Sequence, residues 1–253
     1  MALGGEFAGR RVLVTGGAHG IGWAATLRFL AEGASVAVWA LHPESVEEVR
    51  SRTRGAVWAE AVDVADRQAV EAGYHRLKQA LGPIEILVNN AGYTLTSRFL
   101  EESYEYWQRV VAVNLWGVIH CCRAALPDMV ASGGGAVVNV VSDAGRVGMA
   151  GEAVYAASKG GVIALSRSLA QELARHQIRV NCVSPGPTRT RILEANSAAP
   201  EAERLIAKMV QRIPLRRIAE PEEVAEAIAF LASPRSSHIT GQVLSVSGGL
   251  TML

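Results

Sequence analysis

The stretch that decides the fold of this chain is Thr15-Gly16-Gly17-Ala18-His19-Gly20-Ile21-Gly22. It follows the run Arg11–Thr15, which is typical of a buried strand, and it precedes a segment with helical spacing. The glycines at 16, 20 and 22 allow a tight turn and a close approach to a pyrophosphate, and the helix start offers free N–H groups. A glycine-rich turn without a ligand has the same composition. The position between a first strand and a first helix favours the pyrophosphate-binding interpretation.

Strand and helix patterns alternate along the rest of the chain. Most of the short apolar runs are rich in valine and isoleucine and lack polar alternation, as strands buried on both faces of a parallel sheet do. We expect strands at 11–15, 35–40, 57–62, 84–88, 136–141, 178–183 and 242–246, and helices at 21–33, 43–52, 66–81, 103–132, 152–176 and 221–232. This order predicts one domain with a doubly wound α/β fold. Residues 188–217 do not follow this alternation of strands and helices, and we interpret them as an insertion on one rim of the sheet.

Composition and charge exclude several classes of protein. Hydrophobic residues make up 49% of the 253 residues and charged residues 19%, which excludes disorder. The 25 Lys and Arg balance 24 Asp and Glu, so no basic excess favours nucleic acid as a partner. No apolar stretch of 18 residues and no signal-peptide core are present, so we expect no membrane span. Cys121, Cys122 and Cys182 predict buried thiols in a reducing cytoplasm.

Polar residues stand where two further strands are expected to end. Asp63 follows the strand at 57–62, and Asn89-Asn90-Ala91-Gly92 follows the strand at 84–88. Ligands in open α/β sheets bind outside the carboxyl ends of strands, so these residues are expected to share an edge with the glycine loop. Asp63 can accept a hydrogen bond from an adenine amino group, with helix capping as the alternative. For the two asparagines the alternative is turn chemistry.

A candidate acid/base group lies near the start of the long helix at 152–176. Tyr155 and Lys159 are four residues apart and share a helix face, which places the ammonium near the phenol. A neighbouring cation lowers the pKa of a tyrosine, and a shift from about 10 toward 7 requires roughly 4 kcal/mol. Ser142 ends the preceding strand at the same rim and can hold a substrate oxygen. A Tyr-x-x-x-Lys pair alone is common and carries little weight.

The complete ordered set of motifs resembles the classical short-chain dehydrogenase/reductase family across residues 9–250. The resemblance implies a seven-stranded parallel Rossmann sheet, a nicotinamide cofactor and redox chemistry between secondary alcohols and ketones. It also implies a homotetramer. The implied catalytic residues are Asn114, Ser142, Tyr155 and Lys159. The expected cofactor contacts are Gly16, His19, Gly20, Ile21, Gly22, Ala40, Leu41, Asp63, Val64, Asn90, Ala91, Gly92, Tyr155, Lys159, Pro185, Gly186 and Thr188.

Within that resemblance each catalytic residue has an expected role. Tyr155 is the general acid/base, and Lys159 binds the nicotinamide ribose and lowers the tyrosine pKa. Ser142 orients the carbonyl, and Asn114 holds a water in the proton relay, with a polar residue satisfied inside a helix as the alternative for Asn114. Thr188 contacts the carboxamide, with a helix cap as the alternative.

The end of the second expected strand bears on the choice of cofactor. Members that prefer NAD place an acid where this chain has Ala40, and that acid repels a 2′-phosphate. No Arg or Lys replaces it at Leu41 or His19, and His19 and His42 are the only basic groups nearby. We therefore expect NAD(P)(H) with a slight preference for NADP(H). An engineered replacement of an acid would leave the same pattern.

Two segments bear on the substrate. Residues 142–155 and 239–252 are similar to enzymes that oxidise ring hydroxyls of alicyclic acyl-CoA thioesters, such as 2-hydroxycyclohexanecarboxyl-CoA dehydrogenases, and less closely to 3-oxoacyl-carrier-protein reductases. Arg146, Arg189 and Arg191 could form a basic rim for a CoA phosphate or be ordinary solvated side chains. Glu152 should face the substrate, unless it is only an acid at a helix start.

Three other functions are alternatives to this interpretation of the sequence. Simple cyclic ketones or polyols are alternative substrates for the same chemistry. A non-catalytic dinucleotide-binding redox sensor would not need the acid/base set. An epimerase or dehydratase of the larger related family would carry a sizeable C-terminal substrate domain.

Overall fold

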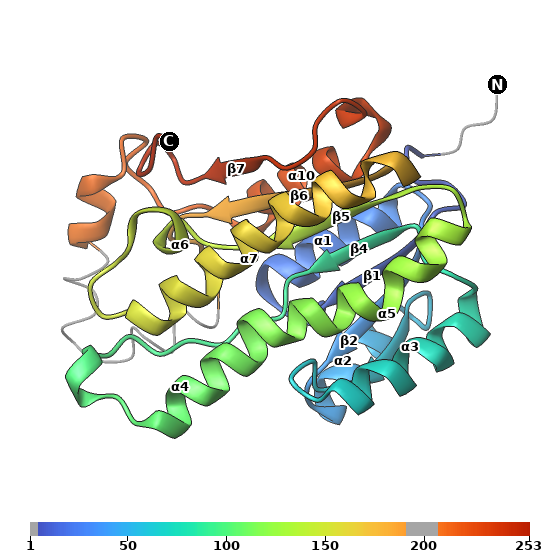
Figure 1. Ribbon diagram of the computed structural model, residues 1–253, viewed down its shortest axis with the longest axis horizontal. Coiled ribbons are helices and arrows are strands. Elements are labelled where there is room, and N and C mark those ends of the chain that lie inside the picture. Colours follow the sequence, from blue (N-terminus) through green and yellow to red (C-terminus); the bar gives the residue numbers. More distant parts are fainter. Residues whose placement is uncertain (1–4, 191–206) are drawn as a thin grey trace.

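The computed structural model describes residues 5–190 and 207–253, and in them a seven-stranded parallel sheet forms the centre of the molecule (Figure 1). The strand order is β3-β2-β1-β4-β5-β6-β7, and every neighbouring pair is parallel. The strands are β1 (Arg11–Thr15), β2 (Ser35–Ala40), β3 (Trp58–Ala61), β4 (Ile86–Asn89), β5 (Gly135–Val140), β6 (Ile178–Pro185) and β7 (Val243–Val246). The doubly wound fold and the seven strands expected from the sequence are confirmed.

Helices cover both faces of this sheet and enclose two apolar cores. One core packs α1 (Gly20–Ala31), α2 (Pro43–Arg52) and α10 (Pro221–Ala232) against the sheet. The other packs α3 (Arg67–Leu81), α5 (Gly117–Ala131) and α7 (Ala153–Leu173) against the opposite face, which is in front in Figure 1. Because both faces are covered, the strands are apolar on both sides, as their valine-rich runs indicated.

Several helix ends follow the local signals in the sequence. The Asp66 carboxylate caps α3 by accepting hydrogen bonds from the backbone N–H groups of Gln68 at 2.8 Å and Ala69 at 3.3 Å. Pro43 and Pro221 occupy the first turns of α2 and α10. Gly33, just after α1, has a φ of +83°, a conformation that suits glycine.

The long helix expected at 103–132 is interrupted in its middle. It consists of α4 (Tyr104–Val111), the π-helical turn η2 (Ala112–Trp116) and α5. The Gly117 N–H donates to the carbonyl oxygen of Ala112, five residues earlier, which is the π-helical spacing. Such turns occur often at functional sites, and this one carries Asn114. The sequence pattern did not indicate the interruption.

By length and composition, the continuous segment Tyr104–Ala131 could cross a membrane. Its most apolar window of 18 residues has a mean hydropathy of 1.4, and half of that window is buried inside the molecule. The window tolerates polar interruptions, whereas the sequence criterion above required an unbroken apolar run. The core helices of soluble proteins have the same length and composition.

The carboxyl ends of the strands define the edge on which the candidate site lies. The glycine loop follows β1, and the short helix α6 (Ala144–Val147) follows β5 at the same edge (Figure 1). The expected rim insertion at 188–217 lies partly outside the described residues. Its described end contains a helix at 207–212.

Candidate active site

The loop between β1 and α1 depends on the absence of side chains at its glycines. Gly16 has a φ of +63°, and a Cβ atom there would lie 2.9 Å from the Cα atom of Ala91. A Cβ on Gly22 would lie 2.2 Å from the Gly16 carbonyl oxygen and 2.4 Å from Nδ2 of Asn90. Both contacts are far closer than real Cβ atoms tolerate. The loop is therefore a tightly folded backbone turn that packs against the segment after β4.

Asn90 and Thr15 tie the glycine loop to the end of β4. The Asn90 side-chain amide donates to the carbonyl oxygens of Thr15 and Gly16, both at 3.1 Å. The Thr15 hydroxyl in turn accepts from the backbone N–H groups of Asn90 and Ala91, both at 3.1 Å. The asparagine thus has a specific task beyond turn chemistry, and Thr15 is a functional residue to which the sequence analysis gave no role.

The start of α1 fits a dinucleotide phosphate. His19 is the N-cap residue, but its side chain makes no capping bond to the first-turn amides at Gly20, Ile21 and Gly22. Those amides and the positive end of the helix therefore remain suited to an anion. Among residues 5–190 and 207–253, a Cβ on Gly20 would meet only the side chain of Thr190 within 4 Å, at 3.1 Å.

The end of β2 lies near an acidic side chain that the sequence did not predict. Ala40 is only 5% exposed, whereas Leu41 is 46% exposed. His19 lies 3.1 Å from the Ser45 hydroxyl through Nε2, and its Nδ1 lies 3.9 Å from a Glu48 carboxylate oxygen. An acid from α2 therefore stands beside the histidine. The local spacing of residues did not predict this contact between the loop after β1 and helix α2.

Asp63 is held more firmly than the sequence indicated. Its carboxylate accepts from the Ala65 N–H at 2.9 Å and pairs with the Arg109 guanidinium at 3.0 Å. It does not cap α3, because Asp66 does that. The neighbouring Val64 is buried, and its carbonyl oxygen lies 3.1 Å from Nδ1 of His120. The ion pair fixes the segment after β3 against α4.

Ser142, Tyr155 and Lys159 meet at the carboxyl edge of β5. Tyr155 and Lys159 lie in the first turns of α7, and the Lys159 nitrogen is 5.8 Å from the centre of the tyrosine ring. Ser142 hydrogen-bonds the Tyr155 hydroxyl. Lys159 is 3% exposed and donates to the Val140 carbonyl oxygen at 2.9 Å. The structure therefore brings together the three side chains that the sequence placed on one rim.

The pKa values of this group differ from the sequence expectation. Burial raises the pKa of Tyr155, the nearby Glu152 carboxylate raises it further, and only the hydrogen bond from Ser142 lowers it. The lowering by Lys159 that the sequence predicted is not among these effects: the Lys159 ammonium donates to the Val140 carbonyl oxygen, and burial dominates the pKa of Tyr155. Burial also lowers the pKa of Lys159 to about 8. Tyr155 is thus a protonated acid at neutral pH.

Asn114 fixes the loop that follows β4. Its Oδ1 accepts from the Tyr93 N–H at 3.1 Å, and its Nδ2 donates to the carbonyl oxygens of Tyr93 at 2.7 Å and Val110 at 2.9 Å. Both amide hydrogens are therefore used by the protein. A Cβ on Gly92 would lie 3.2 Å from Asn114 Oδ1 and 3.8 Å from the Lys159 nitrogen. Asn114 and Lys159 thus converge on Gly92, which joins the cofactor loop to the acid/base group.

The segment after β6 completes the edge. The Gly186 N–H donates to the Val246 carbonyl oxygen at 3.0 Å, and the Pro185 carbonyl oxygen accepts from the Asp143 N–H at 3.3 Å. The Thr188 hydroxyl donates to the Gly186 carbonyl oxygen at 3.0 Å. Thr188 therefore stabilises a turn here.

The proposed basic rim is not supported at the positions that can be described. The Arg146 guanidinium binds the Ser245 hydroxyl and the Leu253 carbonyl oxygen. Arg189 pairs with Glu220 at 3.1 Å. Arg191 lies outside the described residues. Arg146 attaches the loop after Ser142 to the last strand through Ser245. Asp143 of the same loop also accepts a hydrogen bond from the Ser245 hydroxyl, at 3.0 Å.

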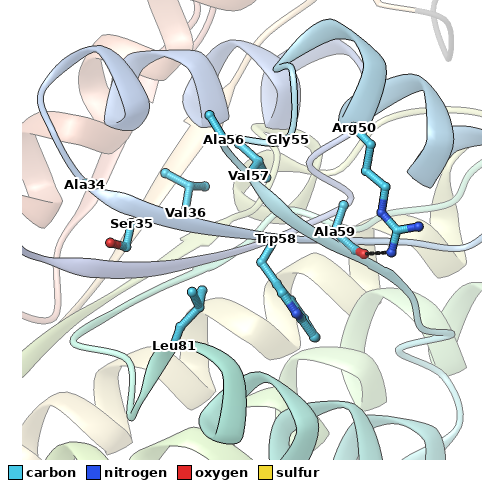
Figure 2. A pocket seen from close by; sticks show the side chains of 10 residues that line it. All are labelled: Ala34, Ser35, Val36, Arg50, Gly55, Ala56, Val57, Trp58, Ala59 and Leu81. Atoms are coloured by element: carbon cyan, nitrogen blue, oxygen red, sulfur yellow. Dashed lines mark hydrogen bonds between the residues drawn. The ribbon is translucent and has the colours of Figure 1, made fainter.

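A separate hollow of about 550 Å³ lies beside the starts of β2 and β3, away from this edge (Figure 2). Most of its lining is apolar, including Val36, Val57 and Leu81. Its one charged side chain, Arg50, donates to the Ala59 carbonyl oxygen at 2.9 Å and pairs with Glu47. It shares no residue with the candidate site, so the chemistry is assigned to the carboxyl edge.

Comparison with known proteins supports the same assignment. Residues 16–251 match a family model described as enoyl-(acyl carrier protein) reductase. The chain is 40% identical over 247 residues to the 3-oxoacyl-[acyl-carrier-protein] reductase FabG of Thermotoga maritima, with 96% of this chain and 98% of the relative covered. It is 42% identical over 254 residues to the cis-4-hydroxycyclohexanecarboxylate dehydrogenase of Sinomonas cyclohexanicum, with 98% and 99% covered. A third relative, 36% identical over 250 residues, is the 2,3-dihydroxy-2,3-dihydro-p-cumate dehydrogenase of Pseudomonas putida, with 97% and 95% covered.

Proposed function

The chain belongs to the classical short-chain dehydrogenase/reductase family, and we propose that its substrate is a cyclic alcohol or ketone or a 3-hydroxyacyl thioester. It is an NAD(P)-dependent oxidoreductase that interconverts secondary alcohols and ketones. The observation that carries the proposal is the convergence of Ser142, Tyr155 and Lys159 on the edge that also holds the glycine loop, with Lys159 close to Gly92. A sensor without catalysis would not need this arrangement.

The residues of the site divide the chemical work between them. A bound dinucleotide supplies or accepts the hydride at the carbon of the substrate. The Tyr155 hydroxyl gives its proton to the ketone oxygen during reduction and takes it back during oxidation. Ser142, which hydrogen-bonds Tyr155, holds the same oxygen beside it. Lys159 binds the ribose, and Asn114 keeps the loop at Tyr93 in place through its three hydrogen bonds.

Replacement of the acid tests this function. Tyr155→Phe keeps the ring but removes the transferable proton, so we expect kcat to fall by roughly 10² to 10⁴ while NAD(P)H still binds. The matched control is Tyr104→Phe, which alters a tyrosine that is 74% exposed on α4. Turnover above about one tenth of the unmodified rate in the first variant would contradict the acid role.

For the cofactor, we propose that the enzyme accepts both NAD and NADP with a slight preference for NADP. Ala40 supplies no carboxylate to repel a 2′-phosphate, which supports the NADP side. Glu48, 3.9 Å from His19, keeps the preference small because it adds negative charge on the same side of the loop.

For assembly and location, we propose a cytoplasmic homotetramer that acts on small molecules. Ala164 and Ser168 are exposed on α7, which suits close helix–helix contact. Large apolar side chains are also exposed on two other surfaces: Leu100 and Trp116 near α4, and Leu244 and Met252 at β7. The free thiols of Cys121, Cys122 and Cys182 are buried and suit a reducing compartment.

A further inference from the structure

A partly buried acid stands beside the candidate acid/base without a partner of its own. Glu152 is the N-cap residue of α7 and stands three residues before Tyr155, with a backbone that is not yet helical (φ −142°, ψ 32°). Its carboxylate acts electrostatically on Tyr155. Within 5–190 and 207–253 it makes no hydrogen bond and no ion pair. A carboxylate in such a position normally needs a partner, because burial removes it from water.

A capping hydrogen bond does not account for this acid. Asp66 shows what a capping acid does in this protein, since its carboxylate accepts two backbone N–H groups of α3. The Glu152 side chain makes no such bond to α7. Burial instead raises the pKa of Glu152, which means that its surroundings oppose the charge. The position is costly for the folded protein alone.

We propose that Glu152 is a specificity-determining residue, which accepts a hydrogen bond from a hydroxyl group on the carbon next to the reacting carbon of the substrate. The inference rests on the proposed function, because it takes Tyr155 as the group that meets the reacting oxygen. The Glu152 carboxylate stands at the start of the helix that carries Tyr155 and acts electrostatically on its hydroxyl. A group bound to Glu152 therefore lies one or two carbon atoms from the reacting centre.

The chemistry of the site selects a hydroxyl over other groups. An ionised carboxylate only accepts hydrogen bonds, so its partner must be a donor. A second cation is disfavoured by the buried ammonium of Lys159, about two turns further along α7. A carboxylate on the substrate at this position is repelled. The preferred substrates are therefore vicinal diols and their α-hydroxy ketones, and keto acids with a nearby carboxylate are excluded.

Three ketones with one ring test the inference: cyclohexanone, 2-hydroxycyclohexanone and 3-oxocyclohexanecarboxylate. The measured quantity is kcat/KM for each, in the unmodified enzyme, Glu152→Ala and Glu152→Gln. We expect the unmodified enzyme to prefer the hydroxy ketone over cyclohexanone by about 10- to 100-fold, the range for a hydrogen bond to a charged group. Glu152→Ala should abolish that preference. Both variants should gain at least about tenfold on the carboxylate.

A control and the remaining outcomes separate this proposal from the proposed function. Glu172→Gln removes an exposed acid from the same helix and should leave all three ratios unchanged. If ketones are reduced but the ratio of hydroxy ketone to ketone is the same with and without Glu152, the specificity proposal is wrong and the function stands. If the unmodified enzyme reduces none of the three, the proposed function fails and this proposal fails with it.

Discussion

Removal of the Asn90 side chain should weaken cofactor binding more than it weakens the fold. The amide donates to the carbonyl oxygens of Thr15 and Gly16, each at 3.1 Å, and Asn90→Ala removes both hydrogen bonds. At roughly 1 kcal/mol for each bond, the loop loses about 2 kcal/mol. The Thr15 hydroxyl still holds the backbone N–H groups of residues 90 and 91, so β1 and β4 remain connected.

The loss should therefore appear mainly as disorder of the glycine loop. If the loss of about 2 kcal/mol reduces only the free energy of cofactor binding, the Kd for NADH or NADPH rises by about 30-fold. If the same loss reduced the free energy of global unfolding, the Tm would fall by about 4–8 °C. We expect an increase in Kd of 10- to 30-fold with a Tm change of about 3 °C or less. Fluorescence titration and thermal unfolding measure the two quantities.

Two further variants make the reasoning refutable. Asn90→Asp keeps the shape but turns an acceptor toward two carbonyl oxygens, so it should bind cofactor more weakly than Asn90→Ala. Asn181→Ala is the matched control, because that buried asparagine also makes two backbone hydrogen bonds, to Ile239 at 2.8 Å and from Gln242 at 3.0 Å, far from the loop. It should lower the Tm without changing Kd. A Kd within twofold of the unmodified value in Asn90→Ala would refute the role of the clamp.

Four further predictions follow from the site and the surface. The pKa of Lys159 is about 8 in the folded chain against a usual 10.5, so the contribution of Lys159 to stability improves as the pH rises from 8 to 10.5. The Tm of Lys159→Met minus the Tm of the unmodified enzyme should therefore be larger at pH 7 than at pH 10.5, while the variant loses turnover and cofactor affinity. Equal Tm differences at both pH values would contradict this. Because Glu152 raises the pKa of Tyr155, Glu152→Gln should move the alkaline limb of the ketone-reduction profile to lower pH, and an unmoved limb would show that the two groups do not interact. Ala40→Asp should shift the ratio of kcat/KM for NADH over NADPH by about 10- to 100-fold toward NADH, whereas an unchanged ratio would mean that residue 40 does not face the ribose. Light scattering at micromolar concentration should give the mass of a tetramer, and a monomer would refute that assembly.

The elements that the sequence determined are those whose signals are local. The strands at 11–15 and 35–40 and the helices at 43–52 and 221–232 have the predicted bounds, since apolar runs, helical spacing and first-turn prolines act within a few residues. The alternation of strands and helices was sufficient to predict the doubly wound fold, because crossover connections between parallel strands are right-handed. The shared edge of the glycine loop, Ser142 and Tyr155 follows from the same rule, since parallel strands all end on one side.

The tertiary structure alone decided what each polar group of the site is bonded to. Arg109 pairs with Asp63 across 46 residues, and Arg146 reaches Ser245 across 99 residues, so no local pattern indicated either contact. The π-helical turn that carries Asn114 arises within an ordinary helical sequence. The pKa of Tyr155 rises because burial and Glu152 outweigh the hydrogen bond with Ser142. Desolvation and charge depend on every element packed around a group, and the sequence lists those elements without placing them together.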